Sequence, residues 1–140
     1  MLIITAQEIN AIAFTEPIDP ALISDDIIKV AENKYLIPTI TKLVYDDLSV
    51  HPVIYQTLMI DYIKPYLAYC VKFLFYSQYL AESSPDPILL QKTSEIANES
   101  NSVLQVKKSL LVNILLSGIY PLYNSPIKKR INGFLIKWRN

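Results

Sequence analysis

The chain has 140 residues, the length of a single domain with one core. Its apolar fraction of 51% excludes a disordered protein, and two glycines are too few for Gly-rich phosphate loops, Rossmann turns or a tight-hairpin β-barrel. The net charge of zero hides an asymmetry. Residues 1–100 hold all 13 acidic residues and six basic ones, a net of −7, whereas residues 101–140 hold seven basic residues and no acid. Such a split indicates an interaction surface.

Helix-start signals dominate the first part of the chain. The run Thr5–Glu8 fits the S/T-x-x-E capping box and predicts a short helix. Ser24 is a favoured N-cap, and Asp25–Asp26 in the following turn suit the positive end of the helix dipole. This second helix should bend or restart at Pro38.

The longest expected element runs from Val53 to about Glu82. Apolar residues occupy nearly every side of it, which predicts a central helix buried by its neighbours or by another subunit. Pro65 lies inside this helix and predicts a kink or a break. The segment Ser83–Pro87 is the clearest linker in the chain.

The region after this linker is expected to be irregular at first and helical later. Residues 88–90 are interpreted as a short strand or extended segment, and the polar residues 92–102 as a loop or frayed turn. Two helices follow, over residues 103–120 and 127–138. The predicted fold class is therefore all-α: about five helices in a bundle, with a polar, partly extended excursion between the long central helix and the C-terminal helices.

The chain is expected to form one domain, residues 1–140. Its parts are an N-terminal arm (1–23), a helical core (24–82), a loop excursion (83–102) and basic C-terminal helices (103–140). Residues 109–127 carry no charge, but they contain several polar residues and two prolines. We therefore expect no membrane partner.

Residues that usually carry catalysis or bind metals are scarce. Cys70 is the only cysteine and lies among apolar residues, which favours a small buried hydrophobe. His51, the only histidine, is expected in a turn between helices. The pairs Asp25–Asp26 and Asp46–Asp47 offer carboxylates for a cation, but adjacent helix residues point about 100° apart, and helix-end roles explain both pairs. We expect no enzyme, no metal and no cofactor.

The basic and aromatic residues of the last forty positions are the candidate interface or DNA-facing residues. They are Lys107, Lys108, Lys128, Lys129, Arg130, Lys137, Trp138 and Arg139. Three of them open the expected last helix, where the helix dipole disfavours cations. This placement favours a charged partner, and the alternative is a solvated helix start.

Several segments rich in apolar and tyrosine residues follow one another along the chain in a characteristic order. Residues 26–38 are DIIKVAENKYLIP, residues 40–48 are ITKLVYDDL, and similar signatures occupy residues 55–58, 62–68 and 92–100. In this order they resemble the phage head–tail connector proteins, over about residues 24–138. Two glycines of that pattern are absent: Thr41 replaces one, and none precedes Lys92.

The resemblance implies a structural protein of the phage virion, located at the head–tail junction after assembly in the host cytoplasm. Such proteins form a ring, often of twelve subunits, below the portal and join the DNA-filled head to the tail. The implied partners are further copies of the chain, the portal protein, tail or further ring proteins, and the DNA that passes through the lumen during ejection.

A closed ring needs two different, complementary surfaces on each subunit. Surplus apolar and tyrosine residues would supply them, although the ten tyrosines are also suited to a core. The opposite charges of the two parts of the chain would pair neighbours in a salt-sensitive way, or direct the basic end to a portal or to DNA. The alternative function is a nucleic-acid-binding module that uses the basic C-terminal segment, against which the pI of about 6.6 argues.

Overall fold

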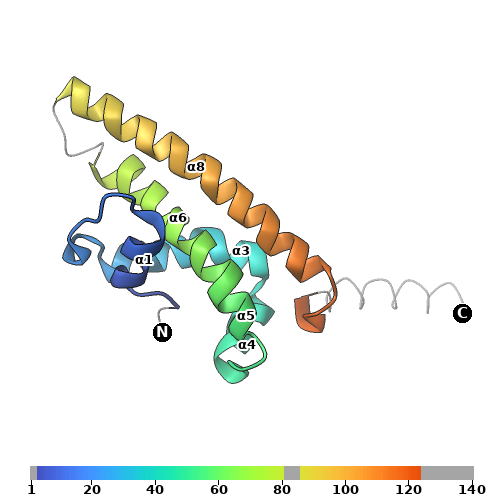
Figure 1. The fold of residues 1–140 in the computed structure, drawn as a ribbon. Coiled ribbons are helices and arrows are strands. Elements are labelled where there is room, and N and C mark those ends of the chain that lie inside the picture. The colour runs from blue at the N-terminus through green and yellow to red at the C-terminus, as the bar shows by residue number, and fades with distance from the viewer. Residues whose placement is uncertain (1–2, 81–85, 124–140) are drawn as a thin grey trace, which may run out of the picture.

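The computed structural model describes residues 3–80 and 86–123, and these residues form helices and connecting turns without a strand (Figure 1). The predicted all-α class is confirmed. The elements are α1 (Ala6–Ala13), the short 3-10 helix η1 (Pro20–Leu22), α2 (Asp25–Ala31), the π-helical η2 (Glu32–Leu36), α3 (Ile37–Ile40), α4 (Lys42–Val50), α5 (Gln56–Leu58), the π-helical η3 (Met59–Ile63), α6 (Lys64–Leu74), the π-helical η4 (Phe75–Leu80) and α8 (Pro87–Leu116).

The first two helix starts are as the sequence predicts. The Thr5 hydroxyl accepts the Glu8 amide at 3.2 Å while a Glu8 carboxylate oxygen accepts the Thr5 amide, so the capping box is complete. The Ser24 hydroxyl accepts the Ile27 amide at 3.3 Å. The expected N-terminal arm, however, is not separate from the core. Its described part buries Ile9 within the core, and α1 packs against α6.

Neither internal proline ends its helix. Residues 25–40 and 56–80 are continuous helical runs, and Pro38 and Pro65 each lie two residues after a π-helical segment. A proline cannot donate to the helical ladder, and its ring collides with the carbonyl four residues back. The wider π turn shifts the ladder by one residue and accommodates the ring. The first run ends instead at Thr41.

The expected excursion is the main error of the sequence interpretation. Residues 87–116 form one helix, α8, so the predicted strand at residues 88–90 and the predicted loop at residues 92–102 are both wrong. The helix begins where the Asp86 carboxylate accepts the Ile88 amide at 3.0 Å, with Pro87 at the first helical position. At 1.5 Å per residue, α8 is roughly 45 Å long.

The buried face of α8 explains why it looked like a loop. Its buried residues recur every three, four or seven positions: Thr93, Ala97, Ser100, Leu104, Leu111 and Leu115. The first three are small or polar, so the helical period is invisible to a search for apolar residues. The Thr93 and Ser100 hydroxyls each donate to a backbone carbonyl four residues back, at 2.7 Å. Burial therefore leaves no hydroxyl unpaired.

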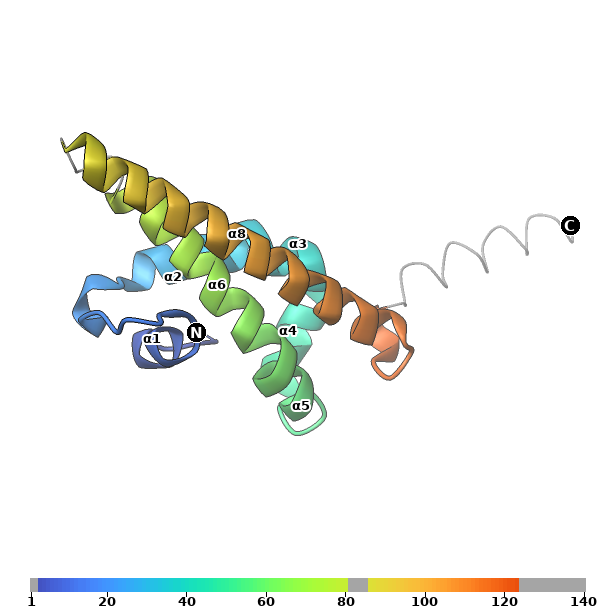
Figure 2. The same ribbon diagram turned by 45° about the horizontal axis from the view of Figure 1, so that its top comes forward.

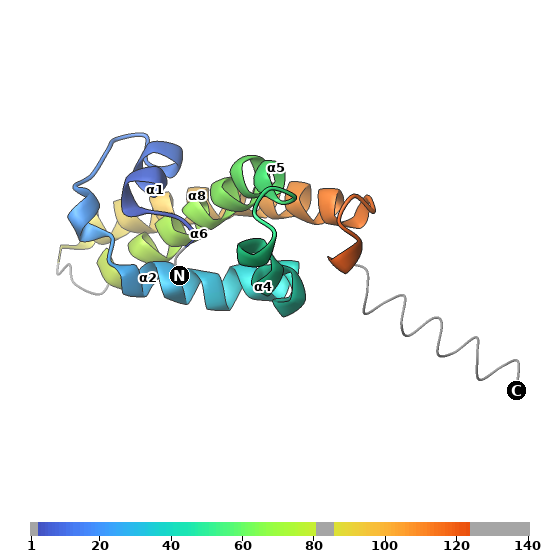
Figure 3. The same ribbon diagram turned by 90° about the horizontal axis from the view of Figure 1, so that it is seen from below.

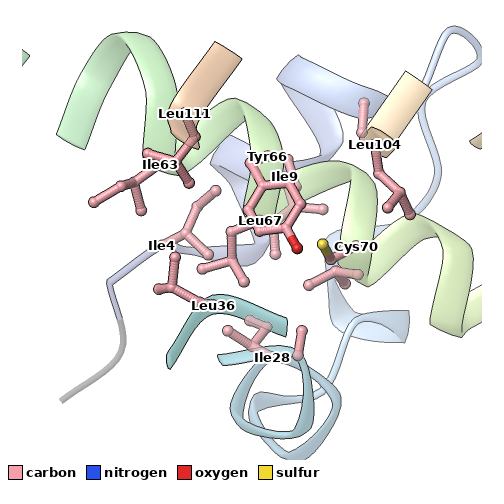
Figure 4. Close-up of a cluster of buried hydrophobic side chains, with 14 of the residues drawn as sticks. Ile4, Ile9, Ile28, Leu36, Ile63, Tyr66, Leu67, Cys70, Leu104 and Leu111 are labelled. Carbon is pink, nitrogen blue, oxygen red and sulfur yellow. The ribbon is translucent and has the colours of Figure 1, made fainter. Parts of the chain in front are cut away.

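Helix α6 is the centre of the bundle, as expected of the long central helix. It packs against α8 on one side and against α1 and α2 on the other (Figure 2, Figure 3). Figure 4 shows the shared core, in which Tyr66, Leu67 and Cys70 of α6 lie among residues of the other helices. The central run begins three residues later than expected, because Val53 and Ile54 are exposed in the turn before it.

Candidate interaction surfaces

Two of the eight predicted interface residues lie on α8. Lys107 is half-buried and Lys108 is exposed, within the part of α8 after residue 100 that contains no acid. The other six lie outside the described residues, as does the expected last helix: Lys128, Lys129, Arg130, Lys137, Trp138 and Arg139.

An exposed aliphatic surface lies where α8 ends. The Tyr55 and Tyr120 rings stack with their centroids 5.5 Å apart and join the turn before α5 to the segment after α8. On the two segments that carry these rings, large side chains are open to solvent, with exposed fractions from 54% to 83%. We call them the apolar end: Val50, Val53, Ile54, Leu116 and Ile119. Exposed apolar residues gathered in this way are typical of an interface.

The tyrosines do not form this surface. Of the ten, nine have described side chains, and all nine are buried or partly buried against the core. The nine described tyrosines therefore fit the alternative that they are core residues. The large side chains that are open to solvent are aliphatic instead, including Val106 and Leu110, one turn apart on α8.

Thr41 has a backbone conformation that normally belongs to glycine. Its φ of 75° and ψ of 154° make it the one described non-glycine residue with positive φ. A side chain in this region costs about 1–3 kcal/mol. The residue ends α3 and begins α4, whose Val44 amide lies 3.5 Å from the Thr41 hydroxyl.

A buried carboxylate lies in the π-helical segment η2. Glu32 is 2% exposed, and its Oε1 accepts the Tyr45 hydroxyl at 2.7 Å. Its Oε2 is buried and has no hydrogen-bond partner among the described residues. Burial, and then the hydrogen bond to Glu32, raise the pKa of Tyr45 to about 12. Glu32 lies four residues from both Ile28 and Leu36, and this helical spacing was the only sequence signal for its burial.

The predicted acidic pair Asp46–Asp47 is used within the fold. Asp46 pairs with Lys42 at 2.9 Å. Asp47 accepts the Tyr55 hydroxyl at 2.7 Å and lies 2.8 Å from Nδ1 of His51, and these two hydrogen bonds lower its pKa. The single histidine therefore fastens the turn after α4. Within residues 3–80 and 86–123, no cluster of three or more His, Cys, Asp or Glu side chains is arranged for a metal ion.

Cys70 is the small buried residue that the sequence predicts. Its side chain lies beside Tyr66 in the core (Figure 4), and burial raises the pKa of its thiol to about 12. A thiol held in the neutral form is a poor nucleophile. Among the described helices, none combines the length and the apolar character that crossing a membrane requires.

A cavity of about 290 Å³ opens beside the first half of α8. Its walls come from the segment after α1, from the end of α6 with η4, and from α8: Phe14, Thr15, Glu16, Lys72, Tyr76, Ile96 and Glu99. The Lys72 ammonium donates to the Ala13 carbonyl at 2.8 Å, and burial lowers its pKa. No feature of the sequence indicated this cavity.

Comparisons with protein-family models, with curated proteins and with solved structures found no match to this chain.

Proposed function

We propose that this protein is a structural subunit of a phage virion. Its copies form an adaptor ring, of about twelve subunits, that joins the portal of the DNA-filled head to the tail and surrounds the DNA conduit. The proposal starts from the resemblance of residues 24–138 to head–tail connector proteins. It requires neither catalysis nor a cofactor, because the ring acts mechanically.

Thr41 is the observation that supports this proposal most directly. The family pattern calls for a glycine there, and the sequence departs from it. The backbone nevertheless adopts a positive φ at that residue, the conformation for which glycine is normally required. The local geometry of the α3–α4 turn thus agrees with the pattern even where the residue type does not.

The apolar end gives the proposed ring a surface to bury. A subunit of a closed ring needs contact faces that a monomer leaves exposed, and aliphatic side chains without a partner suit such a face. In this proposal the apolar end is covered by the portal or by another subunit.

Mass measurement of the full chain, alone and mixed with its portal protein, tests the proposal. We expect a ring of about twelve subunits or a ring–portal complex. The variant Ile54→Asp/Ile119→Asp should lose this association, whereas Leu22→Asp, which alters an equally exposed residue elsewhere, should retain it. A chain that stays monomeric and never binds the portal would refute the proposal.

The second candidate function is a nucleic-acid-binding module. It is favoured by the seven basic residues of positions 101–140, which have no acid among them. A purified monomer that retains DNA with a steep salt dependence would support this function. A salt-insensitive ring without DNA affinity would exclude it.

A further inference from the structure

The cavity beside α8 has apolar walls and an acidic rim. The Phe14 and Tyr76 rings lie with their centroids 5.9 Å apart, and Ile96 faces them from α8. Glu16 and Glu99 are exposed carboxylates that line the same cavity. A volume of about 290 Å³ is at the lower end of small-molecule sites, which range from about 300 to 1,000 Å³. The cavity therefore suits an inserted side chain better than a cofactor.

The charged residues around this cavity have a net negative charge, which favours a second cation in addition to Lys72. Among the described residues, neither Glu16 nor Glu99 has an ion-pair partner within 4.0 Å. Lys72 lines the cavity too, but its ammonium is bound to a carbonyl and lies 5.6 Å from the centre of the Phe14 ring. The three charges sum to −1. A long basic side chain would place its stem on the aromatic walls and its charged head between the carboxylates.

The chain itself carries suitable cations in the residues that follow Tyr123. Five basic residues and no acid lie there: Lys128, Lys129, Arg130, Lys137 and Arg139. We infer that the basic segment 128–130 of one copy docks into the Glu16–Glu99 cavity of the neighbouring copy. This inference rests on the proposed function, because it specifies how adjacent subunits of the ring touch.

Chain length bounds how far the basic segment can reach toward the cavity of its own chain. From Glu99 to Leu116 the helix spans roughly 25 Å at 1.5 Å per residue. The described chain ends beyond this point, at Tyr123, after Tyr120 has stacked on Tyr55. The five residues from Tyr123 to Lys128 span at most about 18 Å. The seven residues from Tyr123 to Arg130 span up to about 25 Å, so length alone does not separate the two arrangements. The contact is assigned to a neighbour because the proposed ring needs a surface on each subunit that binds the next one.

The resulting contact joins two different faces of the subunit. One copy provides its acidic cavity and the next provides its basic segment. An open chain of copies therefore has a vacant cavity at one end and a free segment at the other, and each end can bind a further copy. Such a head-to-tail contact closes into a ring when the rotation between copies allows it. Because the contact is ionic at its rim, added salt should weaken it.

Two full-length variants test this contact. The acceptor-deficient variant is Glu16→Gln/Glu99→Gln, and the donor-deficient variant is Lys128→Gln/Lys129→Gln/Arg130→Gln. We expect each alone to need at least tenfold more protein than the wild type to assemble, as measured by sedimentation velocity. An equimolar mixture should form a 1:1 dimer that does not grow, because only one cavity and one segment remain functional. Asp25→Asn/Asp61→Asn, which removes two exposed carboxylates that do not line the cavity, should assemble normally.

A charge exchange within one chain provides the rescue. The variant Glu16→Lys/Glu99→Lys assembles poorly in this scheme, and adding Lys128→Glu/Lys129→Glu/Arg130→Glu should restore rings. Normal assembly of both neutralised variants would overturn the inference and leave the proposed ring intact. Loss of DNA binding by the donor-deficient variant, with assembly unchanged, would also overturn it. A wild-type chain that is monomeric at every concentration overturns it too, while portal binding then decides the proposed function separately.

Discussion

The two halves of α8 pack on the same side of the bundle with opposite kinds of side chain. The first half buries Thr93, Ala97 and Ser100, and the second buries leucines such as Leu104 and Leu111. Both halves belong to one uninterrupted helix that packs against α6 and η4. The same backbone is therefore held by small side chains at one end and by bulky ones at the other.

This difference between the two halves shows that the residues that stabilise a helix are not the same as those that set how closely it packs against its neighbour. A buried leucine contributes about 1.5–3 kcal/mol through the apolar surface that it removes from water. Thr, Ala and Ser bury little such surface, but they allow a close approach and pair their hydroxyls within their own helix. The leucine half should therefore dominate the stability, and the small-residue half should be sensitive to added volume.

The largest expected effect lies in the leucine half. Leu111 is fully buried, so Leu111→Ala should lower the free energy of unfolding by about 3 kcal/mol through lost burial and a residual cavity. Denaturant titration measures the change. The neighbouring Leu110→Ala alters a side chain that is 48% exposed and should cost far less. Equal losses in the two variants would contradict the assigned burial.

The small-residue half should respond to enlargement instead. Ala97→Leu adds apolar surface, yet it should destabilise the fold by about 2 kcal/mol because the close contact has no space for it. Ser100→Ala is the matched control. It removes a hydroxyl that bonds only to the Ile96 carbonyl of its own helix and should be nearly neutral. Stabilisation by Ala97→Leu would mean that this half is loosely packed.

A substitution outside α8 provides a smaller change in the free energy of unfolding with which these two effects can be compared. Thr41→Gly relieves a positive φ just after α3, which packs against α8, and should raise the free energy of unfolding by about 1 kcal/mol. Glycine also caps helices, so losing the Thr41 hydroxyl costs only a few tenths of a kcal/mol. Thr41→Ala keeps the strain and removes the cap, so it should destabilise. Thermal unfolding compares the three proteins.

The smallest expected effect is a difference between the two halves of α8 in the pH at which they lose hydrogen-exchange protection. Asp47, which holds Tyr55 under the Tyr120 stack, has its pKa lowered below the ordinary 3.8 by the hydrogen bonds from Tyr55 and His51. Its contribution is therefore full above pH 3.8 and is lost as the pH falls through the lower folded-state pKa. Hydrogen-exchange protection should decline first in residues 111–120 and later in residues 93–100. Tyr55→Phe should abolish that order, and a simultaneous decline in the wild type would contradict this role of Asp47.

Local signals predicted the parts of the fold that depend on local chemistry. Thr5 and Ser24 cap their helices with side chains only three residues from the amides that they accept, and both helix starts are confirmed. The first half of α8 was missed because its buried residues are small and polar, so that the helical period carries no apolar signal. Its start at Asp86 was part of the predicted linker, although Asp followed by Pro is a favoured helix start.

The candidate surfaces were less accessible to sequence reasoning, because they depend on residues far apart in the chain. Glu32 and Tyr45 are 13 residues apart and meet only when the α3–α4 turn closes. No signal in the sequence marked the positive φ of Thr41 at the end of α3. The charge asymmetry was visible, whereas the opening that presents Glu16 beside Glu99 was not.

The walls of the cavity come from distant parts of the chain, and this has a consequence for how the proposed ring would select its subunits. Phe14, Tyr76 and Ile96 come from three parts of the chain, and α1 must find α6, more than fifty residues later, before Phe14 is in place. Contacts of such long range carry a larger loop-closure cost than those between α6 and α8, so we expect them to form later in folding. In the proposed ring, a partly folded copy would therefore lack a complete receptor for its neighbour, and only finished subunits would be admitted.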